Sequence, residues 1–165
     1  MDTQPTNLET EIISAITNIP NDIPRGKGDG VWTAAIKRSL IPIGRKRGYN
    51  VCTSGFHEEC DNEWLFDMTW YRNDPPNHLR ELGLVLESEW NRDPAQIKYD
   101  FEKLLIAKSP IKVMVFQDYD DNLPFLWSLL ETGIRSFQTT PTCEKYILAA
   151  FENAKYTFAI RIVTV

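Results

Sequence analysis

Three acidic residues, Asp67, Glu87 and Glu89, stand where they could do chemistry together. Glu87 and Glu89 end the stretch LVLESEW, in which a run of apolar residues indicates a strand buried on both faces. Residues two apart in a strand share a face and lie about 6.6–7 Å apart, so both glutamates should project from the same side. Asp67 belongs to the alternating segment Glu63–Arg72, which predicts a neighbouring strand.

Three carboxylates in one place repel each other and need a positive partner, because buried carboxylates are rarely left unpaired. A hard divalent cation with oxygen ligands fits this need, and we expect Mg²⁺ or Mn²⁺ at Asp67, Glu87 and Glu89. Such a site can activate a water molecule and stabilise charge on a phosphodiester. The alternative is that the strands end in solvent and that both glutamates are ordinary surface charges.

The elements that would position these residues alternate between helix and strand. Apolar periodicity and turn residues predict helices over residues 8–19, 31–46, 93–108 and 121–136, and strands over residues 49–53, 63–72, 82–90, 111–116, 146–151 and 157–165. Pro42 is expected to end or kink the second helix, and Asp93 with Pro94 to start the third. Residues 73–77, with two prolines, are expected to form a turn.

The chain length of 165 residues predicts one domain, with residues 1–30 as an N-terminal helix and loop and a core over about residues 31–165. The apolar strands on either side of the third helix predict a parallel crossover. The fold class is therefore α/β.

The order helix, strand with Asp67, strand with Glu87-Ser88-Glu89, helix, strand resembles the core of the PD-(D/E)xK restriction-endonuclease-like superfamily. The resemblance covers about residues 31–116 and implies a mixed central β-sheet flanked by helices. The third motif position is Glu89 rather than lysine, which is similar to the E-x-E variant of BamHI-type restriction enzymes. Phe66 stands before Asp67, where the family name has proline.

That resemblance implies that Asp67 and Glu87 bind Mg²⁺, and that Glu89 binds metal or acts as a general base. Lys103 could be a lysine relocated to the helix, but it lies roughly 130° from the centre of the apolar stripe on an ideal helix, which favours a solvated side chain. Glu63 is a further candidate ligand, with a surface charge as the favoured interpretation. His57 and His78 are expected on the surface.

The net charge of −5 counts against a protein that merely coats nucleic acid. Basic residues do gather between Lys37 and Arg47, where a solvated helix face is favoured over phosphate contacts. The expected partner is DNA, with RNA not excluded, and the short chain suggests action as a homodimer or with a partner protein.

The first residues show no signal peptide, and no stretch reaches the length of a membrane span, so a cytoplasmic protein without a membrane partner is expected. Three cysteines suggest free thiols. Cys52, His57 and Cys60 have zinc-like spacing, with Cys143 as the fourth ligand needed, but unrelated thiols are favoured.

The sequence therefore predicts a Mg²⁺-dependent phosphodiester hydrolase, an endonuclease acting on DNA. The alternative is a catalytically inactive nuclease-fold module with a binding or regulatory role, which the missing lysine and the acidic net charge favour.

Overall fold

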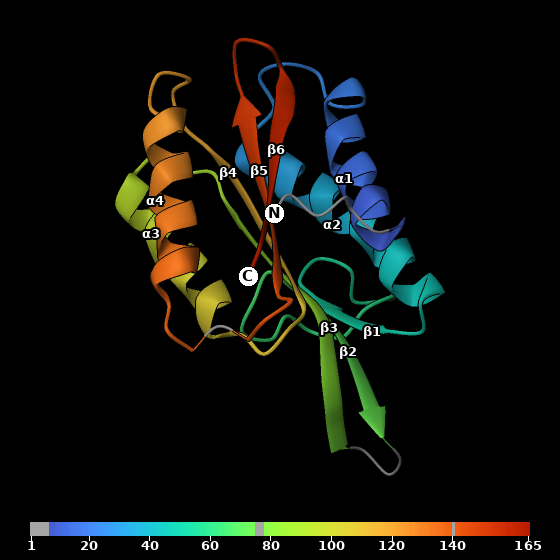
Figure 1. The fold of residues 1–165 in the computed structure, drawn as a ribbon. Helices are drawn as coiled ribbons and strands as arrows, with labels where there is room; N and C mark the ends of the chain where they lie inside the picture. Colours follow the sequence, from blue (N-terminus) through green and yellow to red (C-terminus); the bar gives the residue numbers. More distant parts are fainter. Residues whose placement is uncertain (1–6, 75–77, 140) are drawn as a thin grey trace.

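A computed structural model describes residues 7–74, 78–139 and 141–165. Its centre is one six-stranded sheet in which the strands lie in chain order (Figure 1). The strands are β1 Asn50–Thr53, β2 Met68–Asp74, β3 His78–Glu89, β4 Ile111–Gln117, β5 Lys145–Glu152 and β6 Thr157–Thr164. The pairs β3–β4 and β4–β5 are parallel and the other three are antiparallel, so the sheet is mixed.

Helices cover both faces of the sheet. The helices α1 Asn7–Asn18 and α2 Asp29–Lys46 lie on one face, and α3 Pro94–Ile106 and α4 Leu123–Ser136 lie on the other (Figure 1). A short 3₁₀ helix, Ile19–Asn21, follows α1. Each face has its own apolar core. The predicted α/β class, with a mixed central sheet flanked by helices, is confirmed.

The apolar runs of β3 and β4 are buried from both sides, as the sequence predicts. On β3, Leu84 and Leu86 pack in the core under α1 and α2, whereas Val85 packs in the core under α3 and α4. Glu87 follows Val85 by two residues and therefore faces α3. This alternation decides which helix can reach the acidic side chains.

Helix α2 runs through Pro42 to Lys46, so Pro42 does not end it, and the alternative of a kink at Pro42 stays a prediction. Pro42 lies on the exposed side of the helix, where water can satisfy the carbonyl group that loses its backbone partner. The next turn packs closely on β2. A Cβ atom on Gly44 would lie 2.7 Å from the Trp70 ring, so glycine is required for this approach.

The predicted strand over residues 63–72 begins late, at Met68. Leu65 has a φ of 65°, and the Phe66 N–H donates to the Trp64 carbonyl at 2.8 Å, which makes a tight γ-turn. As a result Phe66 packs in the core under α3 and α4, whereas Met68 packs in the opposite core. The alternation of apolar residues across this segment does not represent one continuous strand.

Helix α3 begins as the sequence predicts. The Asp93 side chain accepts a hydrogen bond from the Ala95 N–H at 2.9 Å, and Pro94 is the first helical residue. The predicted strands near the C-terminus also form, as β5 and β6. Part of the predicted turn over residues 73–77 lies outside the described residues. Within the described parts of the chain, no helix is long and apolar enough to cross a membrane.

Candidate active site

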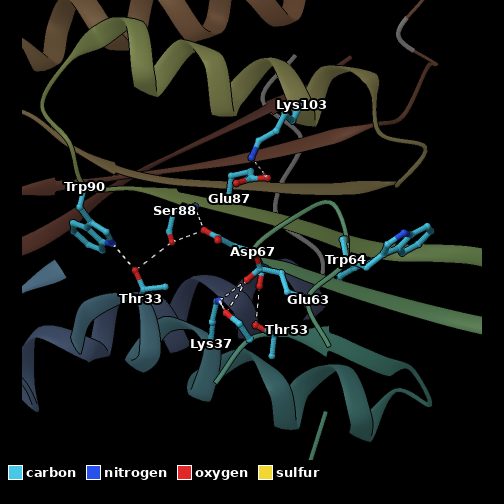
Figure 2. A network of polar contacts seen from close by, with 12 residues as sticks. Thr33, Lys37, Thr53, Glu63, Trp64, Asp67, Glu87, Ser88, Trp90 and Lys103 are labelled. Carbon is cyan, nitrogen blue, oxygen red and sulfur yellow. Dashed lines mark hydrogen bonds and ion pairs between the residues drawn. The ribbon is translucent and has the colours of Figure 1, made fainter. Parts of the chain in front are cut away.

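Asp67 and Glu87 meet where β2 begins and β3 approaches its end. Asp67 directly precedes β2, and the pairing of Met68 with Leu86 places Asp67 beside Glu87 on the neighbouring strand. Figure 2 shows the two carboxylates between helix α3 on one side and α2 on the other. The two residues are close enough for the charge of Asp67 to raise the pKa of Glu87.

Two hydrogen bonds from Ser88 hold the Asp67 carboxylate. The Ser88 backbone N–H donates at 2.8 Å and its hydroxyl at 2.7 Å, and both bonds go to Oδ2. Both donors use the same oxygen, which leaves Oδ1 for another partner. The Thr53 hydroxyl also donates to the Asp67 carbonyl at 2.7 Å, so backbone and side chain are both held.

A hydrogen-bonded chain connects Asp67 to the aromatic core. The Trp90 indole N–H donates to the Thr33 hydroxyl at 2.9 Å, and this hydroxyl lies 3.5 Å from that of Ser88 (Figure 2). Trp90 itself packs against the rings of Trp32 and Phe151. The position of Asp67 therefore depends on residues far from it in the sequence.

Glu87 is a buried carboxylate with little compensation. Its exposed fraction is 3%, and the Lys103 ammonium group lies 2.8 Å from its Oε1. Lys103 is the partner that the described residues give to Oε1, and it is shared with Asp100. Burial, followed by the nearby charges of Asp67 and Asp100, raises the pKa of Glu87 to about 8 even though Lys103 acts against them.

Lys103 reaches the site from α3, so the expectation of a solvated lysine is wrong. Its Nζ lies 2.9 Å from Asp100 Oδ1 as well as 2.8 Å from Glu87 Oε1, and its side chain is 33% exposed. The angle around the helix misleads because a lysine stem is long enough to bend back along the helix surface. Burial alone would lower the pKa of Lys103, but its bonds to Glu87 and Asp100 raise it, so this amine stays charged.

Glu89 belongs to a second acidic pair. Its Oε1 accepts a hydrogen bond from the Asn91 N–H at 2.6 Å. Burial raises the pKa of Glu89, and a hydrogen bond shared with Asp100 raises it further. Asp100 thus lies between Glu89 and Lys103. The sequence indicated neither Asp100 nor Ser88 as part of the site, because both roles depend on the packing of α3 and the course of the chain before β2.

The carboxylate oxygens of Asp67 and Glu87 suit a cation that needs few protein ligands. Among the described residues, no group of three or more His, Cys, Asp and Glu side chains gathers in a way that could hold a metal ion. Mg²⁺ usually takes only one or two carboxylates and completes its shell with water and phosphate oxygens. The buried carboxylate of Glu87, whose ammonium partner Lys103 is shared with Asp100, fits such a cation. The assignment of Asp67, Glu87 and Glu89 as metal ligands remains a prediction.

Lys37 and Glu63 form a separate contact below Asp67, between a buried lysine and an exposed carboxylate (Figure 2). Lys37 is not part of a solvated face, since it is buried and donates to Ser54 at 2.8 Å and to Glu63 at 3.2 Å. Burial alone would raise the pKa of Glu63, but the hydrogen bonds from Ser54 and Lys37 lower it. Glu63 therefore already has a cationic partner.

The basic residues that follow Lys37 also have partners. Arg45 pairs with Glu59, and Lys46 and Arg47 both pair with Glu11. These contacts neutralise much of the segment that could have held phosphate groups.

The zinc alternative gains no support from the geometry. Cys52, Cys60 and Cys143 are free thiols, and Cys52 is buried whereas Cys143 is exposed. The His57 ring lies within hydrogen-bond distance of Asn62 Oδ1, at 3.1 Å. The favoured expectation of unrelated thiols agrees with this arrangement.

Comparison with protein-family models gives no match, and comparison with curated proteins gives none either. Among solved structures, the chain is similar to E. coli MS115-1 NucC in its cAAA-bound form, with 8% sequence identity and a TM-score of 0.44. The alignment covers 99% of this chain and 86% of that chain. At this level of similarity no residue role or activity is transferred, and the site is interpreted from this chain's own residues.

Proposed function

We propose that the chain is a Mg²⁺-dependent phosphodiester hydrolase, with DNA as the expected substrate. One observation carries the proposal: Glu87 is buried, lies beside a second carboxylate, Asp67, and shares its ammonium partner Lys103 with Asp100. Two carboxylates of this kind without full compensation are costly to a fold unless a cation joins them. The order of elements around them also follows the resemblance to the PD-(D/E)xK core.

In this proposal Asp67 and Glu87 hold the cation. The bound cation supplies a water molecule of lowered pKa and a counter-charge for the phosphate group. Ser88 keeps Asp67 in place through its two hydrogen bonds. Glu87 must lose its proton before it can bind, because a pKa of about 8 leaves it largely protonated at neutral pH.

In this proposal Lys103 supplies the positive charge that the E-x-E pattern lacks in the sequence. Its raised pKa excludes a role as a general base near neutral pH and suits a fixed counter-charge for a phosphate oxygen. In this proposal Glu89 acts as the general base, in keeping with its raised pKa.

The test is a cleavage assay on supercoiled plasmid, single-stranded DNA and RNA, each with Mg²⁺, Mn²⁺ or EDTA. Cleavage should require the metal, and Glu87→Gln should abolish it because the shape stays and the charge is lost. Glu102→Gln is the matched control, since Glu102 is an exposed carboxylate on α3 that pairs only with Lys98 among the described residues. Cleavage that persists in EDTA or in Glu87→Gln contradicts the proposal, and absence of both cleavage and metal binding favours the catalytically inactive module.

A further inference from the structure

The turn directly before Asp67 holds two apolar side chains out from the surface. Leu65, at the centre of the γ-turn, has a φ of 65° and is 69% exposed. A leucine with positive φ is a strained conformation, and such strain concentrates at functional sites. Its neighbour Trp64 is 43% exposed and points away from Lys103 in Figure 2.

Trp64 differs from the other tryptophans of the chain. Trp32, Trp70, Trp90 and Trp127 are all buried, and all five tryptophans lie in the described residues. A tryptophan gains most from burial, and this one stands exposed on a strained turn three residues before Asp67. The fold keeps this ring at the surface although the hydrophobic effect favours its burial.

Trp64 forms one wall of a shallow hollow of about 200 Å³. We call it the Trp64 hollow, and its lining residues are Cys52, Trp64, Tyr71, Asn73 and Leu79. The Tyr71 hydroxyl donates to Asp61 at 2.6 Å, which holds the tyrosine ring as a rigid wall. The side-chain amide of Asn73 offers both a donor and an acceptor at the rim.

The Trp64 hollow lies on the same sheet face as Glu87. Cys52 pairs with Thr69 across β1 and β2, and Thr69 pairs with Val85 across β2 and β3. Residues paired in this way share a face, and Glu87 follows Val85 by two residues on β3. The far ends of β2 and β3 also extend beyond the helices (Figure 1), so this end of the face is not covered by a helix. The hollow thus shares a sheet face with Glu87, and Trp64 on its wall is three residues from Asp67 in the chain.

We propose that the Trp64 hollow binds an unpaired nucleobase of the strand whose phosphate lies at Asp67 and Glu87. A base has a planar π-face that stacks on an aromatic ring whatever its identity, and the exposed leucines can pack against its edges. Bases in a duplex are stacked inside the helix and cannot enter, so the hollow selects single-stranded or locally opened nucleic acid. This inference rests on the proposed function, since it names the substrate class of the same site.

The fluorescence of Trp64 provides a direct test in EDTA, where no cleavage occurs. The probe is an oligothymidylate about 12 nucleotides long, compared with an oligouridylate and a blunt duplex of equal length. Because the other tryptophans are buried, quenching by added oligonucleotide reports on Trp64. Both single strands should quench the fluorescence to saturation, and the duplex should not. Equal quenching by duplex and single strand, or none by either, overturns the proposal.

Variants separate stacking from a change in the fold. Trp64→Ala should weaken binding of labelled oligothymidylate by about 5- to 150-fold, measured by anisotropy, and Trp64→Phe should retain most of it. Tyr99→Ala is the control, because Tyr99 is an exposed aromatic residue on α3 outside the hollow. Unchanged binding by Trp64→Ala overturns the proposal. So does a wild-type dimer that Trp64→Ala dissociates, since a second copy of the chain would then occupy the hollow.

The two proposals can fail separately. Single-strand binding that depends on Trp64, without metal-dependent cleavage, supports the hollow and contradicts the hydrolase. Cleavage that is lost in Glu87→Gln but is equal in Trp64→Ala and wild type, on duplex and single strand alike, supports the hydrolase and contradicts the hollow.

Discussion

Two lysine–glutamate pairs lie on the same face of the sheet and differ in how completely they are compensated. Lys112 on β4 bonds to Glu144 and lies beside Val85, whereas Glu87 is the next residue of β3 on that face and pairs with Lys103. The first pair lies toward the start of β4, and the second lies where β3 approaches its end. The two pairs can be compared because each has a buried ionisable group on this face, on the neighbouring strands β3 and β4.

The Lys112–Glu144 pair is closed. The Tyr146 hydroxyl accepts from Lys112 at 3.2 Å and donates to Glu144 at 3.2 Å, so each member bonds to the other two. Burial lowers the pKa of Lys112, but the hydrogen bond and charge of Glu144 oppose that effect. One positive and one negative group balance here, and no further ligand is needed.

The Glu87–Lys103 pair is open. One amine is shared by Glu87 and Asp100, and Asp67 lies close by. The surplus of negative charge is what distinguishes it from the structural pair. The comparison teaches that a buried ion pair alone says little about function, whereas an unbalanced cluster of charges is where the proposed cation would bind.

The largest expected effect is on stability at the closed pair. Glu144→Gln should lower the free energy of unfolding by about 3–5 kcal/mol, because it leaves the Lys112 charge buried and unpaired. Glu87→Gln in EDTA should cost far less, since Lys103 is partly exposed and keeps Asp100 as a partner. Urea denaturation of both variants measures the contrast, and equal losses would remove the distinction between the pairs.

The stability of Glu87→Gln should also differ from that of wild type in its pH dependence. The pKa of Glu87 is raised from 4.5 to about 8 in the folded protein, so its contribution to stability is present below pH 4.5 and is lost as pH rises toward 8. Glutamine does not titrate. The stability of Glu87→Gln relative to wild type should therefore increase over that pH range, and a constant difference would contradict the raised pKa.

A smaller effect, on the rate of cleavage, is expected from the loss of the Lys103 charge. Lys103→Met should reduce cleavage by about 10- to 100-fold, which is less than the loss of a fully buried donor to a reacting group because Lys103 is partly exposed. It should also move the acidic limb of the pH–rate profile to higher pH, because Lys103 now lowers the pKa of Glu87. Lys98→Met, on the same helix, serves as the control. A loss of rate without a shift in the profile would mean that Lys103 does not act on Glu87.

The smallest effect should come from Ser88→Ala. This change removes the hydroxyl bond to Asp67 but keeps the bond from the backbone N–H, so about 1 kcal/mol of positioning is lost. Metal affinity should fall several-fold, and Thr33→Val should have a still weaker effect through the contact to Ser88. An effect of Thr33→Val larger than that of Ser88→Ala would contradict this chain of contacts.

Local patterns in the sequence predict most of the elements and the approach of Asp67 to Glu87, whereas the role of these residues stays a prediction. Two patterns predict their elements correctly: the apolar run before Glu87 predicts β3, and Asp93-Pro94 predicts the start of α3. They succeed because burial and capping depend on only a few neighbouring residues. The predicted strand that contains Asp67 begins too early, because the γ-turn at Leu65 does not interrupt the alternation of apolar residues in the sequence. Lys103 and Asp100 are missed since their roles depend on how α3 lies against β3.

The central claim is that Asp67 and Glu87 form a cation site, and calorimetric titration with Mn²⁺ tests it most directly. Wild type should bind one ion at Asp67 and Glu87, and the apparent affinity should fall about tenfold for each pH unit below 8 as Glu87 is protonated. Glu87→Gln and Asp67→Asn should each lose binding, whereas Glu102→Gln should retain it. No binding by wild type, or binding that survives both site variants, would contradict the account.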